Sequence, residues 1–435
     1  MPRPRCANYD RGVLRRWRRG LAGACVLALL TLPLLRAGIE PPVALAAETD
    51  AEIRPGEVLV ETDQPLAPGR AALTASRYVA RVAPGAERAS AAALNARPGT
   101  RAAPNYIRRA QVTPGDPFYA QQWALTRIEA PSAWDIQRGV ASVTIAVLDS
   151  GADLGHPDLA GKLLAGENTL GAGSAACPTT TTAADDHSSA HGTHVAGIAG
   201  ASTDDGAGVA SLAWRPMILP IKVLDCQGVG DDAQIVAGID RAIARGAQVI
   251  NLSVGGPGQS SVLDAGIERA WRAGIIIVAA AGNQGTTTPF YPAASPHALA
   301  VGATDASDRL LPISNHGWWL GVVAPGSAIL STYRRDLDGW DVALGYQRKT
   351  GTSMASPHVA ALAALLISSF PGHGPDRIGG IIRAAADRIE ACPTGITSCP
   401  YDLTGHNDYY GHGRINAARA LRLVRSTILP LIGRG

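Results

Sequence analysis

Lysine is almost absent from this chain, and charged residues as a whole are few. Only Lys162, Lys222 and Lys349 occur among 435 residues, and charged residues make up 17% of the chain. The net charge of +3 divides into +8 for residues 1–110 and −5 for residues 111–435. Basic residues are therefore not gathered into a phosphate-binding stripe, and we expect no nucleic-acid partner.

Long apolar runs are lacking beyond the amino terminus. Arg15 and Arg16 precede an uncharged run at residues 20–35, and small residues follow at 44–46. This layout predicts a secretory signal peptide over residues 1–47 and hence a secreted protein. The run is shorter than the roughly 20 residues that span a bilayer, so an anchor that keeps the protein at the cell envelope is the alternative. Twin-arginine export is a second alternative to the general route.

Extended disorder and collagen-like repeats are excluded by composition. Hydrophobic residues make up 46% of the chain, although Gly and Pro together number 79. That apolar content is enough to fold, and the length suits one large domain with accessory segments.

A small folded module is expected between the signal peptide and the main domain, over residues 48–115. An apolar strand pattern occurs at residues 57–60 and an Ala-rich helical pattern at residues 86–94. The order of strand, helix and strand favours a small α+β module over a plain linker, and such a module would be marginally stable alone.

The main domain, from Asp116 onward, alternates buried strands with helices. Near-continuous apolar runs predict strands at residues 143–148, 218–224, 248–252, 274–280 and 298–301, with helices at 191–201, 232–245 and 261–273. This order predicts an α/β fold with a doubly wound, mostly parallel sheet and helices on both faces. Active sites collect at the carboxyl ends of such strands, where Asp149, Ser253 and Asn283 stand.

Three motifs place an Asp, a His and a Ser at element boundaries. They are VLDSG at residues 147–151, HGTHVAG at 191–197 and GTSMASP at 351–357. Hydrolysis of an unactivated acyl bond needs a nucleophile, a base to take its proton and an acid that holds the base in one tautomer. Asp149, His191 and Ser353 meet that need.

These motifs, with AAAGN at residues 279–283, resemble those of the subtilisin-like serine proteases, a resemblance that covers residues 116–421. It implies that Asp149 orients His191, that His191 is the general base, and that Ser353 is the nucleophile. Asn283 matches the family position whose side-chain amide joins the oxyanion hole. The implied protein is an endopeptidase that acts on polypeptides, and it needs no cofactor for catalysis.

Other interpretations of the same residues are weaker. An α/β-hydrolase would place its Ser before the Asp and His, whereas Ser353 comes last. Relatives that act in acid carry a Glu in place of His191, so activity is expected at neutral to alkaline pH. His194 and His358 are interpreted as structural. A catalytically silent binding protein on this scaffold is the alternative of a different class.

Two glycine-containing segments are predicted to hold an extended substrate by pairing of backbone edges. Phe290 matches the position at the back of the primary specificity pocket, and it implies a shortened pocket that prefers medium apolar side chains. The predicted substrate-binding residues are Gly228, Val229, Gly230, Ser253, Val254, Gly255 and Phe290.

A structural calcium ion is a further expectation from the resemblance. Asp116, Asp158 and Asp205 lie in three segments that form a calcium site in many relatives, and calcium prefers carboxylate and carbonyl oxygens. Solvated surface acids are the alternative.

The cysteines predict disulfides rather than a metal site. After removal of the signal peptide four remain, Cys177, Cys226, Cys392 and Cys399, which allow three pairings. The short spacing of Cys392 and Cys399 favours a local bridge, which leaves Cys177 with Cys226.

The resemblance also gives residues 48–115 a role. Residues 104–107 resemble the end of an inhibitory propeptide, so we expect a zymogen cleaved between Ile107 and Asp116. The peptidase domain is then residues 116–425, followed by a short apolar tail at 426–435. The mature enzyme is expected to be a monomer.

Overall fold

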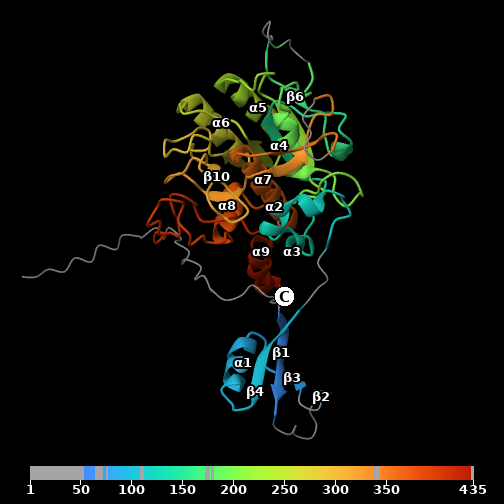
Figure 1. The fold of residues 1–435 in the computed structure, drawn as a ribbon, viewed down its shortest axis with the longest axis vertical. Helices are drawn as coiled ribbons and strands as arrows, with labels where there is room; N and C mark the ends of the chain where they lie inside the picture. Colours follow the sequence, from blue (N-terminus) through green and yellow to red (C-terminus); the bar gives the residue numbers. More distant parts are fainter. Residues whose placement is uncertain are drawn as a thin grey trace, which may run out of the picture. The chain divides into compact units, whose positions relative to one another are not determined.

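The computed structural model describes residues 53–63, 72–74, 77–107, 112–171, 177, 181–337 and 343–432. The signal peptide predicted at residues 1–47 lies outside these residues. The module before residue 108 and the domain after residue 111 are described separately below (Figure 1).

The first module is a four-stranded antiparallel sheet with one helix. It consists of β1 (Ile53–Thr62), β2 (Ala72–Thr74), β3 (Arg77–Arg81), α1 (Glu87–Asn95) and β4 (Thr100–Tyr106), with strand order β2-β3-β1-β4. Among the described residues of the module the apolar core is small and consists of Val58, Val60, Tyr78 and Ala91. The strand and helix patterns at residues 57–60 and 86–94 fall within β1 and α1, and so few buried side chains predict low stability for the module alone.

The main domain is built on a seven-stranded parallel sheet with strand order β11-β10-β9-β8-β5-β7-β6. Its strands are β5 (Thr144–Asp149), β6 (Glu167–Asn168), β7 (Met217–Lys222), β8 (Val249–Leu252), β9 (Ile276–Ala280), β10 (Ala298–Thr304) and β11 (Val322–Pro325). Every residue of β5, β8 and β9 is buried, as expected for strands covered on both faces. The predicted doubly wound α/β fold is confirmed.

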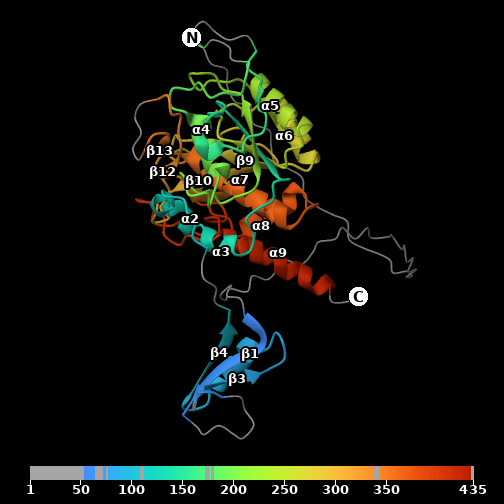
Figure 2. The ribbon, with the colours of Figure 1, turned by 90° about the vertical axis from the view of Figure 1, so that its right-hand side faces the viewer.

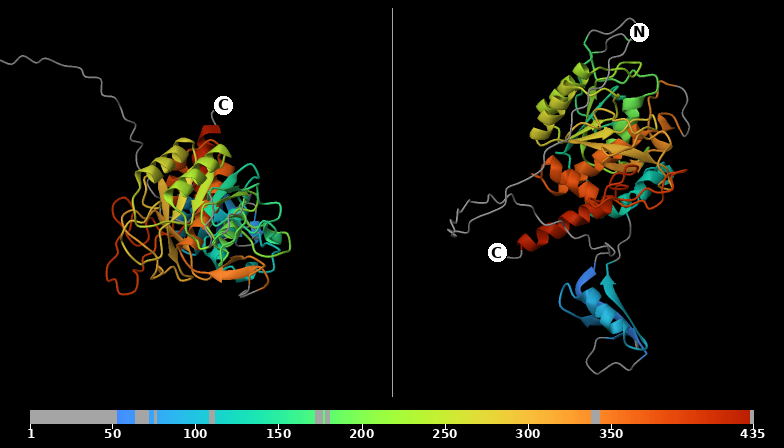
Figure 3. Two further views of the ribbon diagram at one scale, coloured as in Figure 1. Left: turned by 90° about the horizontal axis from the view of Figure 1, so that it is seen from above. Right: turned by 90° about the vertical axis from the view of Figure 1, so that its left-hand side faces the viewer.

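Helices cover both faces of this sheet. On one face α5 (Asp232–Ala244) and α6 (Ser261–Arg272) pack side by side, as Figure 3 shows. On the other face lie α4 (His191–Gly200), α7 (Thr352–Ser369), α8 (Pro375–Ala384) and α9 (Ala417–Ile432), which Figure 2 shows together. Asp231 begins α5 with a capping box and Ser260 caps α6, so both starts are encoded locally.

Smaller elements complete the domain. They are η1 (Tyr119–Gln121), α2 (Trp123–Arg127), α3 (Ala130–Trp134), η2 (Pro157–Leu159), and a hairpin of β12 (Ile329–Thr332) and β13 (Tyr346–Lys349). The backbone of α9 continues to Ile432, into the segment predicted as a short apolar tail from residue 426. Within the described residues, α7 is long and apolar enough to cross a membrane, and 83% of it is buried inside the domain.

The chain reverses its winding direction between β5 and β8. From β5 the chain moves through α4 to β7 on one side, and from β8 it moves through α6 to β9 on the other. A crevice opens outside the carboxyl ends of two such strands. Asp149 ends β5 and Ser253 follows β8, so the fold brings the predicted site residues to this crevice.

Candidate active site

Asp149 and His191 form a hydrogen-bonded pair. His191 begins α4, and its Nδ1 lies 2.7 Å from Oδ1 of Asp149, whose side chain is completely buried. The same oxygen accepts the backbone N–H of Ser150 at 2.7 Å. Because a carboxylate can only accept, the Nδ1 atom of His191 carries the proton. Nε2 is left as the basic nitrogen.

The environment of His191 raises its pKa above the ordinary value of 6.5. Burial is the largest single influence and lowers the pKa, but the charge and hydrogen bond of Asp149, together with the charge of Asp185, outweigh it. Lys349 opposes them weakly. A base with a raised pKa binds the proton of a nucleophile more readily, as general base catalysis requires.

Ser353 stands in the first turn of α7, where backbone N–H groups lack partners within the helix. Its hydroxyl donates to the carbonyl oxygen of Ser253 at 3.2 Å, and the hydroxyl of Ser253 donates to the carbonyl oxygen of Ser353 at 3.0 Å. These two bonds tie the start of α7 to the end of β8. Ser353 and His191 line the same groove.

Asn283, just after β9, presents its amide N–H groups to that groove. Its Oδ1 accepts both the backbone N–H and the hydroxyl of Thr352, at 2.9 and 3.1 Å. With the oxygen so occupied, Nδ2 is the free donor end. Residue 351 is glycine with φ of 151°, and a Cβ there would lie 3.3 Å from the amide. The glycine leaves room for Asn283 beside Ser353.

Asp185 connects the segment that carries Asp149 to the helix that carries His191. Asp185 was not identified from the sequence. Its Oδ1 accepts the hydroxyl of Ser150 at 2.9 Å, and its Oδ2 accepts the backbone N–H of Thr193 at 3.0 Å. Asp185 is buried and therefore holds the residue after Asp149 against the first turn of α4. Asp185 lies two residues before His187, outside the motifs that identify Asp149 and His191, so no local pattern pointed to it.

The groove has a volume of about 630 Å³, and three of the four predicted catalytic residues line it, namely His191, Asn283 and Ser353. All seven predicted substrate-binding residues line it, namely Gly228, Val229, Gly230, Ser253, Val254, Gly255 and Phe290. The ring of Phe290 packs so closely on Gly255 and Gly282 that a Cβ at either glycine would lie within 3.0 Å of it. Phe290 thus forms a wall of the groove.

The comparisons with known proteins agree with this geometry. The Subtilase family profile matches residues 141–413. The chain belongs to the subtilase family. A thermophilic serine proteinase of Bacillus sp. (strain AK1) is 38% identical over 325 residues, covering 74% of this chain and 72% of the relative. Thermitase of Thermoactinomyces vulgaris is 38% identical over 311 residues, covering 71% of this chain and 99% of thermitase.

A solved protease structure from Pseudoalteromonas arctica PAMC 21717 matches with a TM-score of 0.63 and 28% identity, covering 72% of this chain and 99% of that one. The chain is therefore a serine-type endopeptidase that acts on polypeptides, and catalysis in subtilases needs no cofactor.

His194 and His358 lie inside this subtilase with structural contacts. The Nε2 atom of His194 lies 2.9 Å from the carbonyl oxygen of Gln347, and the Nδ1 atom of His358 lies 3.0 Å from that of Met354. Burial lowers the pKa of His194 to about 3 and that of His358 to about 4, so both are neutral at physiological pH. Their neutral, buried state suits packing and not proton transfer.

The predicted calcium ligands form a loose acidic cluster. Asp116 Oδ2 accepts the N–H of Asp204 and Asp158 Oδ2 accepts the N–H of Val209, each at 2.8 Å. The other carboxylate oxygen of both Asp116 and Asp158 is buried without a partner. In the described part of the chain no three His, Cys, Asp or Glu side chains converge closely enough to hold one metal ion. Asp205 is near enough to raise the pKa of Asp158 by its charge.

The cysteines pair as their spacing favours. Cys177 is bonded to Cys226 and Cys392 to Cys399. Cys226 lies two residues before Gly228, so the first disulfide anchors the start of a groove edge.

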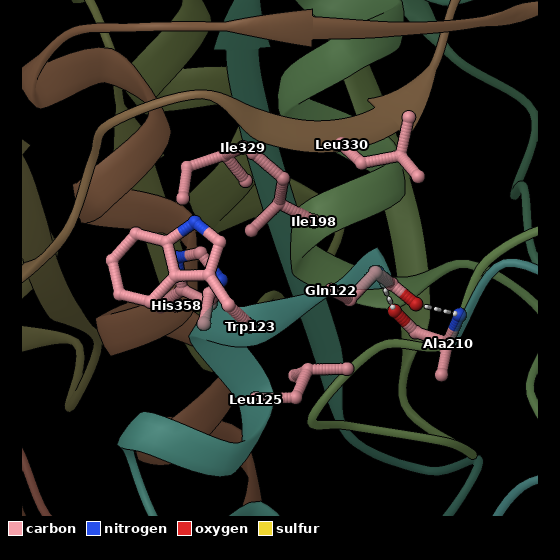
Figure 4. Close-up of a pocket in the computed structure, with 9 residues that line it drawn as sticks. Gln122, Trp123, Leu125, Ile198, Ala210, Ile329, Leu330 and His358 are labelled. Atoms are coloured by element: carbon pink, nitrogen blue, oxygen red, sulfur yellow. Dashed lines mark hydrogen bonds between the residues drawn. The ribbon is translucent and has the colours of Figure 1, made fainter. Parts of the chain in front are cut away.

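A second, buried cavity of about 10 Å³ lies between α2, β12 and α7, with room for about one water molecule (Figure 4). The side chain of Gln122 donates to the carbonyl oxygen of Ala210 and accepts its N–H, at 2.8 and 2.7 Å. Gln122 and Ala210 are bonded to each other in this way, and most of the remaining lining is apolar. This cavity belongs to the core and not to the groove.

Proposed function

We propose that the chain is a secreted subtilase made as a zymogen, in which Asp149, His191 and Ser353 form the catalytic triad and Asn283 stabilises the oxyanion. The observation that carries this proposal is the Asp149–His191 hydrogen bond of 2.7 Å at the edge of a groove that Ser353 and Asn283 also line. No other described histidine in the groove has a buried carboxylate bonded to its ring.

In the first half of the reaction Ser353 Oγ attacks the carbonyl carbon of the scissile peptide bond. The hydroxyl proton moves to Nε2 of His191, and Asp149 stabilises the imidazolium that forms. The carbonyl oxygen becomes an oxyanion, which receives hydrogen bonds from Asn283 Nδ2 and from the Ser353 backbone N–H. The C–N bond then breaks, and His191 returns its proton to the leaving amine.

In the second half, water repeats the sequence on the acyl-enzyme. His191 takes a proton from water, the resulting hydroxide adds to the ester carbonyl, and the C–O bond to Ser353 breaks as the proton returns to Oγ. His191 must be neutral to begin either half. The rate therefore falls as the pH drops below the raised pKa of His191, which favours neutral to alkaline activity.

Labelling with a fluorophosphonate probe tests the nucleophile. We expect the wild-type enzyme and Ser369→Ala, a control on the same helix, to be labelled, whereas Ser353→Ala is not. Labelling that survives in Ser353→Ala contradicts the assignment. A folded wild-type protein that never labels supports the silent binding scaffold instead.

We propose that Phe290 shortens the primary specificity pocket. The ring lies against Gly255 and Gly282 and occupies space at the wall of the groove. Peptides with Leu before the scissile bond should be cleaved faster than matched peptides with Phe or Ala. A clear preference for Phe before the scissile bond would contradict this proposal.

The zymogen proposal assigns residues 48–115 as an inhibitory propeptide behind a signal peptide at 1–47. Support comes from the compact α+β module at residues 53–107 and from the composition of the amino terminus. Mass spectrometry of the protein in the culture medium should find a mature chain beginning between Ile107 and Asp116. Retention of the protein in the cell envelope, or an uncleaved chain with full activity, would contradict it.

We propose a structural calcium ion at Asp116, Asp158 and Asp205, with backbone carbonyl oxygens completing its coordination because the three carboxylates do not themselves converge on one point. The chemistry of the site supports it, because two buried carboxylate oxygens have no partner and calcium takes carboxylate and backbone oxygens. The ion would neutralise the cluster and fix the loop around Asp205 to the segments that carry Asp116 and Asp158.

A further inference from the structure

A second histidine, His187, lies in the groove beside His191. The two rings are 6.4 Å apart and nearly perpendicular, and both residues line the groove. His187 stands before α4, in the segment that carries Asp185. The backbone of His187 is held at both ends: its N–H donates to Asp185 Oδ1 at 3.1 Å, and its carbonyl oxygen accepts from Arg334 Nη1 at 3.1 Å.

The contacts of His187 fix which ring nitrogen carries the proton. Its Nδ1 accepts the backbone N–H of Ser189 at 3.3 Å and lies 3.0 Å from the Ser189 hydroxyl. A ring nitrogen that accepts an N–H carries no proton, so the proton is on Nε2. A Cβ added to Gly228 would lie 2.7 Å from this Nε2. The N–H donor of His187 is therefore at the groove edge formed by Gly228, Val229 and Gly230.

The geometry of an extended substrate brings one side chain toward this donor. Successive side chains of an extended peptide point to opposite faces. If the residue before the scissile bond enters the pocket at Phe290, the residue before it points away from Phe290, toward other parts of the groove lining such as His187 and His191. A side chain at position 228 would collide with the His187 ring, so glycine at this position lets the ring reach the groove edge.

We propose that His187 is a specificity-determining residue, which donates from Nε2 to the side chain two residues before the scissile bond and favours hydrogen-bond acceptors there. When protonated, His187 favours a carboxylate over the matching amide, so the preference for an acidic side chain grows as the pH falls. This inference rests on the proposed function.

The charged groups around His187 are consistent with a neutral ring at neutral pH. Burial and the charge of His191 lower its pKa below 6.5, the charges of Asp185 and Asp149 raise it, and that of Lys349 lowers it. The net direction is downward. Protonation therefore occurs on the acidic side of neutrality, where a glutamate side chain of the substrate is still ionised.

The test compares two peptides that differ only in Glu or Gln at this position. The measured quantity is the ratio of their kcat/KM values at pH 8 and at pH 5.5, because the titration of His191 affects both peptides equally and cancels. We expect the Glu/Gln ratio to rise roughly two- to fivefold toward pH 5.5 in the wild type, the range for a partly exposed ion pair. The same rise is expected in His373→Gln, a control outside the groove, and none in His187→Gln.

A ratio that does not change with pH in the wild type, or a rise that persists in His187→Gln, overturns the proposal. Fluorophosphonate labelling of each variant shows that its active site is intact. If the wild type is labelled but its Glu/Gln ratio of kcat/KM does not change with pH, only the proposed role of His187 is wrong. A wild type that neither labels nor cleaves either peptide defeats the proposed function as well.

Discussion

Two groups of aspartates in the main domain are neutralised in different ways. In the first, here called the arginine-paired cluster, Asp308 accepts from Arg127 and Arg414, and Asp387 accepts from Arg414 and Arg419. The guanidinium groups form forked hydrogen bonds, such as the 2.9 Å bond from Arg127 Nε to Asp308 Oδ1. Each carboxylate in this cluster faces at least one fixed positive charge.

The second group, here called the unpaired cluster, consists of Asp116, Asp158 and Asp205. Among the ion pairs of the described residues none involves these three. Burial, opposed by the hydrogen bond from Val209 and aided by the charges of Asp205 and Asp116, raises the pKa of Asp158 to about 8. Burial also raises the pKa of Asp116. Asp158 and Asp116 therefore take up a proton or a cation more readily than a free aspartate does.

The difference separates two ways of stabilising clustered acids. Arginine in the first cluster is part of the chain, so its stabilisation does not depend on solution conditions apart from extremes of pH. The unpaired cluster depends on what the solution supplies, whether protons or calcium. Stability should therefore respond to chelators and pH through the unpaired cluster, and to mutation of arginine through the other.

Calcium removal should have the largest effect. With free calcium at 100 to 1,000 times its dissociation constant, the ion would stabilise the fold by about 3–4 kcal/mol. For a domain of this size a chelator should then lower the Tm by roughly 10 °C. Calorimetry on Ser353→Ala, which avoids self-digestion, measures this shift with calcium and with EGTA. Magnesium should not restore the Tm, and a Tm indifferent to EGTA would rule out the calcium site.

Substitution of Arg414 should have the next largest effect. Arg414→Met removes the guanidinium that joins Asp308 to Asp387 and leaves two largely buried carboxylates with fewer partners. We expect a loss of ~2–3 kcal/mol in the free energy of unfolding. The control Arg272→Met breaks an exposed pair with Glu268 and should cost less than ~0.5 kcal/mol.

Denaturant unfolding with calcium present isolates this effect from the other cluster. If Arg414→Met is as stable as Arg272→Met, the arginine-paired cluster contributes nothing beyond surface pairing. An equal loss with and without calcium would confirm that the two clusters act independently.

The sequence was sufficient to predict the sheet and to bring the proposed nucleophile to the groove, but not to predict either cluster of aspartates. Continuous apolar runs identify strands covered on both faces, and β5, β7, β8, β9 and β10 lie where such runs predicted them. Asp149, His191 and Ser353 stand in long motifs at element ends, which local sequence reveals. The Arg127–Asp308 pair joins residues 181 positions apart, and no local pattern reports which acid a given arginine will meet.

Asp185 and His187 were not identified from the sequence for the same reason: their contacts join segments that are far apart in the chain. Asp185 and His187 lie in a short polar stretch without periodicity, and their roles come from the approach of β5, α4 and Gly228 in space. The hairpin of β12 and β13 was also missed, because its strands are four residues each and β13 is largely polar. These features depend on contacts between distant segments, which local sequence patterns do not report.

The pH dependence of stability should show the smallest of the three effects. The folded-state pKa of Asp158 is about 8 against 3.8 for the free group, so in the absence of calcium the native state binds a proton that the unfolded state does not. The contribution of Asp158 to stability is then complete below about pH 4 and is lost as the pH rises toward 8. Between pH 6 and pH 8 the loss should be ~2 kcal/mol, at about 1.4 kcal/mol for each pH unit below the pKa.

The variant Asp158→Asn keeps an oxygen that can accept from Val209 but has no proton to lose. In EGTA its free energy of unfolding, measured in urea at pH 6 and pH 8, should lack the decline of the wild type. With calcium bound to the wild type, the carboxylate is held ionised and its decline should also disappear. If the free energies of unfolding of the wild type and the variant change in parallel with pH in EGTA, Asp158 does not titrate in this range. The stability provided by the unpaired cluster would then be as independent of pH as that of the arginine-paired cluster.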